Sequence, residues 1–126
     1  GLVDHHAKEG IAIIAYSPIE QGILTGKFTP DHRPDGFRAD KPRFSPEGLR
    51  AVQPVLAELD AAARAHGRTM AHAALAWLLK DPNVVVIPGA KTVAQLEENV
   101  GGADWQLTPA ELDRIEEAYR EYAKRF

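Results

Sequence analysis

The fold of this 126-residue chain is decided by two short apolar runs, Ile11-Ala12-Ile13-Ile14-Ala15-Tyr16 and Val84-Val85-Val86-Ile87. Neither run alternates apolar with polar residues, which is typical of strands buried on both faces of a parallel sheet. The sequence between them carries helical patterns and is long enough for a crossover connection, so the runs are predicted to form a βαβ unit. This organisation predicts the α/β class.

Helix signals flank the first strand and precede the second. Residues 1–9 have the pattern of the last turns of a helix, and Gly10 is placed to end it. Ser45-Pro46-Glu47 offers an N-cap, a proline at the first helical position and an early acid. The helix that begins there is expected to run to residue 66, with Pro54 as a kink or restart point.

Three further helices are expected nearer the C-terminus. Residues 69–80 are apolar nearly all round, so this helix is predicted to be well buried. Thr92 is expected to cap a helix that runs through Asn99. Thr108-Pro109-Ala110-Glu111 is a capping box that starts the last helix. Its apolar stripe is predicted to comprise Leu112, Ile115, Tyr119, Tyr122 and Phe126.

The segment 17–45 shows no sustained period and is rich in proline and glycine. A structureless connection of this length is unusual within a compact domain. The segment is therefore predicted to be either functional or disordered.

Composition narrows the possible functions. The chain has 15 Lys and Arg, 18 Asp and Glu, a net charge of −3 and no cysteine. The missing cysteines exclude disulfides, thiol nucleophiles and cysteine-ligated metals, and the charge balance argues against a nucleic-acid partner. No apolar run approaches the roughly 20 residues of a membrane span, and no signal-peptide pattern opens the chain. We expect a protein of the cytoplasm with no membrane partner.

Two catalytic patterns are absent. Residues 22–28 resemble a P-loop at first sight, but Gln21 stands where its first glycine belongs and Phe28 where a Ser or Thr would hold magnesium. Ser17 follows a strand as a hydrolase nucleophile would, yet Ala15 and Ile19 replace both glycines of the nucleophile elbow. A hydrolase is accordingly disfavoured.

The histidines do not predict a metal site. His5 and His6 are adjacent, so they point in directions about 100° apart on a helix and cannot grip one ion. His66 is expected near a helix end, and His72 is expected to be a partly buried helix residue.

Two segments, 16–27 and 87–99, follow the predicted strands and suggest a ligand site, because ligands of parallel α/β sheets bind at the carboxyl ends of strands. Gly22 and Gly26 let backbone N–H groups approach an anion, and Lys27 adds positive charge. The helix N-terminus after residue 91 is a second anion site. Amide and carboxylate groups suited to a purine edge share one face of that helix: Gln95, Glu98 and Asn99. Together these features suggest a dinucleotide.

These two segments resemble those that follow the seventh and eighth strands of aldo-keto reductases. The first match is Ala15-Tyr16-Ser17-Pro18-Ile19-x-x-Gly22-Ile23-Leu24-Thr25-Gly26-Lys27. The second is Ile87-Pro88-Gly89-Ala90-Lys91 with Gln95-Leu96-Glu97-Glu98-Asn99. Residues 73–79 are similar to the helix between those strands, so the resemblance covers essentially the whole chain.

The resemblance implies the C-terminal portion of a TIM (β/α)8 barrel, incomplete as given. Residues 1–126 would form part of one aldo-keto reductase domain with no internal boundary. The implied activity is hydride transfer from NADPH to small aldehydes or ketones, with NADP(H) expected ahead of NAD(H). The family's Asp–Tyr–Lys–His tetrad belongs to its first four strands, so no residue here is assigned a catalytic role. The chain alone is predicted to be inactive.

The resemblance also implies cofactor contacts. Tyr16 would stack on the nicotinamide. The pyrophosphate would be lined by Ser17, Pro18, Ile19, Gly22, Leu24 and Lys27. The adenosine 2′-phosphate would be surrounded by Gly89, Ala90, Lys91 and Thr92. The adenine would lie near Gln95, Glu98 and Asn99.

The chain departs from some family members, which carry a Lys at the position of Gly89 and an Arg at that of Gln95. Lys91 is then the main local cation for the 2′-phosphate. A second functional hypothesis is a noncatalytic fragment that self-associates or binds a partner through its unpaired apolar faces.

Overall fold

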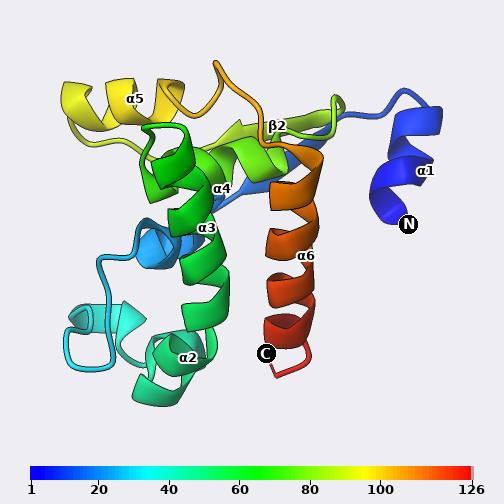
Figure 1. Cartoon of the computed structure of the whole chain (residues 1–126). Coiled ribbons are helices and arrows are strands. Elements are labelled where there is room, and N and C mark those ends of the chain that lie inside the picture. The colour runs from blue at the N-terminus through cyan, green and yellow to red at the C-terminus, as the bar shows by residue number, and fades with distance from the viewer. Residues whose placement is uncertain (126) are drawn as a thin grey trace.

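The computed structural model describes residues 1–125, and Figure 1 shows its course. The helices and strands are α1 (Leu2–Lys8), β1 (Ile13–Tyr16), α2 (Pro46–Ala51), α3 (Gln53–Ala65), α4 (Met70–Leu78), β2 (Val84–Ile87), α5 (Val93–Val100) and α6 (Pro109–Ala123). Short 3₁₀ turns lie at η1 (Glu20–Thr25), η2 (Gly36–Arg38) and η3 (Pro42–Phe44). Phe126, expected in the stripe of the last helix, lies outside the described residues.

The two strands pair in parallel, in a register that runs from Ile13 opposite Val84 to Tyr16 opposite Ile87. The intervening chain includes α2, α3 and α4, so the connection is the predicted helical crossover. The α/β class and the parallel pairing are thus confirmed. The sheet is an open pair of strands within residues 1–125 and not a closed barrel.

The prediction that both strands are buried on two faces is wrong. One face carries Ile14, Tyr16, Val85 and Ile87, whose exposed fractions are 64%, 82%, 50% and 54%. Residues on the other face are half-buried, and α4 packs beside the sheet in Figure 1. The difference arises because the described helices that contact the pair cover only one side of it.

The predicted helix starts are confirmed by their caps. The Oγ of Ser45 accepts a hydrogen bond from the Gly48 N–H at 3.0 Å, and Thr69, Thr92 and Thr108 each accept from the residue three positions on. Such caps satisfy N–H groups that the helix itself leaves unpaired. Pro54 falls in the first turn of α3, so a restart occurs there.

The core forms where α3 packs between α4 and α6 (Figure 1). Its most deeply buried side chains include Phe44, Leu49, Val55, Leu59 and Ile115. Helix α4 has six buried residues, as its apolar sequence predicts, and four of them belong to this core: Ala73, Ala74, Ala76 and Trp77. Each large side chain removed from water contributes about 1.5–3 kcal/mol.

The segment 17–45 is neither structureless nor unanchored. It contains η1, η2 and η3, and it buries Ile23, Phe28 and Phe44 in the core. The Phe28 and Phe44 rings meet edge to face, with centroids 5.6 Å apart. Arg33 donates to the Phe44 carbonyl at 2.7 Å, which ties the outer part of the segment to the same anchor. The hydrophobic periodicity of a sequence does not reveal isolated buried side chains such as these.

A polar pair joins α3 to α6. The Nε2 atom of His66 lies 3.0 and 3.1 Å from the two carboxylate oxygens of Glu111, which is only 6% exposed. The Thr108 N–H donates to Glu111 Oε2 at 2.8 Å. Burial opposes the charge of Glu111, but hydrogen bonds from Thr108 and the contact with His66 outweigh it and lower the pKa of this carboxyl below its ordinary value.

Replacing Glu111 by Gln is expected to lower the free energy of unfolding by about 1–3 kcal/mol at neutral pH, because charged hydrogen bonds to a buried carboxylate are lost. The folded-state pKa is depressed, so this contribution is present above the unfolded-state pKa and disappears as pH falls through the folded-state pKa. Urea unfolding of both proteins at pH 7 and in acid measures the difference. An equal gap at both pH values contradicts the assignment.

Candidate functional site

An open cleft of about 820 Å³ lies between the segment that follows β1 and the loop and helix that follow β2. Parallel pairing brings these segments together because both strands end at the same edge of the sheet. Most of the predicted site residues line it: Ser17, Pro18, Ile19, Gly22, Lys27, Gly89, Ala90, Lys91, Gln95, Glu98 and Asn99.

The chain after β1 has an unusual backbone. Ser17, Glu20 and Gln21 have φ angles of 50°, 48° and 54°, and Gly22 has a φ of 100°. A left-handed conformation costs a residue other than glycine about 1–2 kcal/mol. Backbone strain of this kind clusters at functional sites. The strain therefore makes this wall of the cleft a candidate for a functional role.

Side chains from η3 and from the residue that precedes it hold the strained residues in place. Arg43 forms an ion pair with Glu20, and the Lys41 Nζ donates to Gln21 Oε1 at 3.1 Å. At Gly22, an added Cβ would lie 2.7 Å from the Cε of Lys27. Glycine thus lets the Lys27 side chain pass close to the backbone at this wall.

The opposite wall is tied together by the side chains of α5. The Lys91 N–H donates to Gln95 Oε1 at 2.7 Å, and Asn99 Nδ2 donates to the Gly89 carbonyl at 3.3 Å. Each amide therefore uses one end to hold the loop 89–91. Among residues 1–125, the Nε2 of Gln95 and the Oδ1 of Asn99 have no protein partner, so both can meet a ligand.

The cleft is positively charged. Its ionisable lining comprises the cations Lys27, Arg38 and Lys91 and a single acid, Glu98. Within the described part of the chain, none of the three cations forms a salt bridge. The first turn of α5 adds N–H groups and the positive end of its dipole. This arrangement suits an anion with several phosphate groups.

Three of the predicted residues lie elsewhere. Tyr16 extends from the exposed face of β1, beside Ile87 in the strand register. Leu24 packs against the core, and Thr92 caps α5 outside the lining of the cleft.

Sequence reasoning missed several residues that line the cleft: Gln21, Thr25, Phe37, Arg38, Thr69 and Met70. Phe37 and Arg38 come from η2, in a stretch without periodicity. Thr69 was identifiable as a helix cap, but its sequence context does not indicate that it faces α5.

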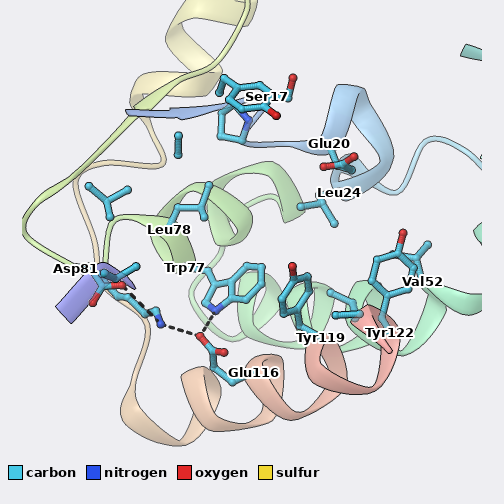
Figure 2. A pocket seen from close by; sticks show the side chains of 18 of the residues that line it. Ser17, Glu20, Leu24, Val52, Trp77, Leu78, Asp81, Glu116, Tyr119 and Tyr122 are labelled. Carbon is cyan, nitrogen blue, oxygen red and sulfur yellow. Dashed lines mark hydrogen bonds and ion pairs between the residues drawn. The ribbon is translucent and has the colours of Figure 1, made fainter. Parts of the chain in front are cut away.

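A second cavity, of about 700 Å³, lies under the covered face of the sheet, between α4 and α6 (Figure 2). Trp77 Nε1 and Lys80 Nζ both donate to Glu116 Oε1, at 3.0 and 2.7 Å. Burial opposes the charge of Glu116, but these donors outweigh it and lower the pKa of the carboxyl. These polar groups are partnered within the fold, whereas none of the three cations of the cleft forms a salt bridge within residues 1–125. We therefore regard the cleft as the candidate site.

Two further features of residues 1–125 bear on function. They include no group of three or more His, Asp or Glu side chains placed to hold a metal ion. None of their helices is both long and apolar enough to span a bilayer.

The sequence is similar to those of oxidoreductases from several organisms. An uncharacterized oxidoreductase of Mycobacterium bovis is 45% identical over 121 residues, which are 96% of this chain and 38% of the relative. The aldo-keto reductase yakc [NADP(+)] of Schizosaccharomyces pombe is 34% identical over 94% of this chain and 36% of its own length. The NADH-specific methylglyoxal reductase of Escherichia coli is 35% identical over 86% of this chain and 33% of its own.

A solved structure shows the same fold. The glycerol dehydrogenase from Gluconobacter oxydans superposes with a TM-score of 0.84 over 95% of this chain and 37% of that protein, at 21% identity. The chain thus has the architecture of part of a TIM barrel. It spans between 33% and 38% of the length of these proteins.

The family profile described as "Aldo/keto reductase family" matches residues 1–120, nearly all of the sequence. The predicted relationship is confirmed by this match. The chain belongs to the aldo/keto reductase family of oxidoreductases.

Proposed function

We propose that this chain is the cofactor-binding C-terminal portion of an NADP(H)-dependent reductase of aldehydes and ketones. The observation that carries the proposal is the cleft at the ends of β1 and β2, where Lys27, Arg38 and Lys91 form no salt bridge among residues 1–125. A phosphate-bearing dinucleotide matches this charge, the Lys27 side chain that passes close to Gly22 and the N-terminus of α5.

Each wall has a distinct task in this proposal. The segment after β1, with Lys27, holds the pyrophosphate, and Tyr16 on the exposed strand face stacks on the nicotinamide. Lys91, Thr92 and the first turn of α5 surround the 2′-phosphate. The adenine edge is met by groups of α5, including the free Nε2 of Gln95 and the free Oδ1 of Asn99.

Bound NADPH would supply the hydride that reduces a substrate carbonyl, while the residues of this chain bind and orient the cofactor. The acid–base tetrad that the family resemblance implies belongs to earlier strands of a barrel. We therefore infer that the chain alone binds the cofactor without turnover. We also propose that the protein is located in the cytoplasm.

Titrating the chain with NADPH and following nicotinamide fluorescence is expected to show binding in the micromolar range, because both walls of the cleft are already formed. Turnover of aldehydes, followed by loss of absorbance from NADPH, is expected to be absent. Failure to bind at millimolar NADPH contradicts the proposal, and so does turnover by the chain alone.

Cofactor preference is carried by Lys91 in this proposal. The printed names of the relatives include an NADP(+) enzyme and an NADH-specific one, so the family accommodates both. Lys91 ends the loop 89–91, directly before the Thr92 cap, and forms no salt bridge within the described residues.

The change Lys91→Ala is expected to weaken NADPH binding about tenfold and to affect NADH much less, because only NADPH carries the 2′-phosphate. Lys124→Ala is the matched control, since it removes the same charge from the exposed end of α6. Parallel titrations of both cofactors measure the effect. Equal losses for NADPH and NADH rule out the assignment of Lys91.

A second candidate function rests on the exposed sheet face. Ile14, Tyr16, Val85 and Ile87 form a contiguous apolar surface, and each strand has one unpaired edge within residues 1–125. Unpaired strands with apolar faces favour association. The chain could thus act as a noncatalytic module that binds a partner or a second copy.

If that surface associates, light scattering is expected to show a concentration-dependent increase in mass that Val85→Lys abolishes. Leu2→Lys is the matched control, because Leu2 is also an exposed apolar residue but lies on α1, outside the sheet face. A monomer at all concentrations, or association that Val85→Lys leaves intact, is evidence against this function.

A further inference from the structure

We propose that Thr69, at the start of α4, is a positioning residue that orients the Glu98 carboxylate on α5 to recognise an exocyclic amino group of the bound purine. This inference rests on the proposed function, since it assumes that the cleft holds an adenine dinucleotide. It assigns a role to a residue outside the segments that the sequence motifs define.

The hydroxyl of Thr69 makes two hydrogen bonds at once. Its oxygen accepts from the His72 N–H at 3.3 Å, which caps α4, and its proton is donated to Glu98 Oε1 at 2.5 Å. A hydroxyl has one donor and two acceptor sites, so both bonds can form together. The start of one helix thereby holds a side chain of another.

His72 fixes the backbone beside the same carboxylate. Its Nδ1 accepts from the Thr69 N–H at 3.4 Å, which leaves Nε2 as the donor of the ring. The Nε2 atom donates to the Glu98 carbonyl at 2.7 Å and lies 3.6 Å from Glu98 Oε2. The imidazole is 12% exposed, so little water competes for these contacts.

Two glycines at the end of α5 allow it to pack closely against α4. A Cβ added to Gly101 would lie 2.7 Å from the His72 Nε2, and one added to Gly102 would lie 2.8 Å from the Cβ of Leu75. The end of α5 therefore sits directly on the first turns of α4. Arg68 strengthens the junction by donating to the Gly101 carbonyl at 3.1 Å.

Helix α5 depends on these polar contacts because it has no buried residue of its own. An apolar face would hold most helices against a core, but here the junction with α4 sets the orientation. Glu98 lines the cleft from this helix, and its carboxylate lies at the N-terminus of α4, where the helix dipole favours negative charge.

The chemistry of Glu98 defines what it can recognise. A carboxylate accepts hydrogen bonds and donates none, so it favours the amino group of adenine over the keto group of hypoxanthine. In this proposal, the Thr69 hydroxyl donates to Oε1 of Glu98 and fixes the orientation of the carboxylate, so that Oε2 can accept from the purine. Loss of the hydroxyl donor should therefore reduce base discrimination more than general affinity.

The test compares Thr69→Ser with Thr69→Asp. Serine keeps the cap and the donor, whereas aspartate keeps the cap but cannot donate to Glu98. Each protein is titrated with NADPH and with its deaminated analogue, the reduced nicotinamide hypoxanthine dinucleotide phosphate. We expect the wild type and Thr69→Ser to bind NADPH more tightly than the hypoxanthine analogue. In Thr69→Asp, the ratio of the two dissociation constants is expected to shrink about tenfold.

Two controls separate positioning from general stability. Thr108→Val removes a cap from α6, far from Glu98, and is expected to lower the melting temperature without changing the base preference. In a Glu98→Ala background, Thr69→Asp is expected to cause no further loss of preference, because the residue acts through Glu98. Equal weakening of both cofactors by Thr69→Asp overturns the inference, as does a further loss in that background.

A ligand-free measurement separates this inference from the proposed function. Thr69→Asp is expected to speed amide hydrogen exchange across α5 while α3 stays protected, and Thr69→Ser is expected to leave α5 unchanged. Unchanged exchange in α5 overturns the positioning role even if NADPH binds. If exchange changes as expected but the wild type binds neither cofactor, the proposed function fails, together with the purine role of Glu98.

Discussion

The parallel pairing of β1 with β2 is the constraint on which the rest of the structure depends. The register from Ile13–Val84 to Tyr16–Ile87 makes both strands end together. Two segments more than sixty positions apart in sequence then face each other across one cleft. The crossover through α2, α3 and α4 is needed to return the chain for this pairing, and its helices form the core. The candidate binding cleft and the hydrophobic core are consequences of the same topological step.

Much of this architecture is readable from local sequence. Caps such as Ser45 and Thr108 satisfy backbone groups within three residues, so their signals survive without any knowledge of tertiary packing. Both walls of the cleft are likewise predictable, because they immediately follow the strands. The exposed face that carries Ile14 and Val85 is not, since burial depends on which elements surround a strand and not on its own residues.

Tertiary contacts account for most of what the sequence does not reveal. Arg38 reaches the cleft only because Phe28 and Phe44 anchor an irregular segment in the core. The bond between Thr69 and Glu98 joins residues 29 positions apart, and neither residue type signals the other. Tertiary contacts of this kind depend on how helices dock, which local propensity does not encode.

The anchoring of the segment after β1 also bears on how this protein can change over evolutionary time. Phe28 and Phe44 meet in the core, so the stretch between them is a loop closed at its base by one aromatic contact. Lengthening such a loop is inexpensive, at about 0.6 kcal/mol for each doubling. Insertions there would leave the core and the strand ends intact. Insertions next to Arg38, outside the contacts that Lys41 and Arg43 make with the segment after β1, would alter what passes over the cleft. This part of the stretch is where related sequences can diversify in length.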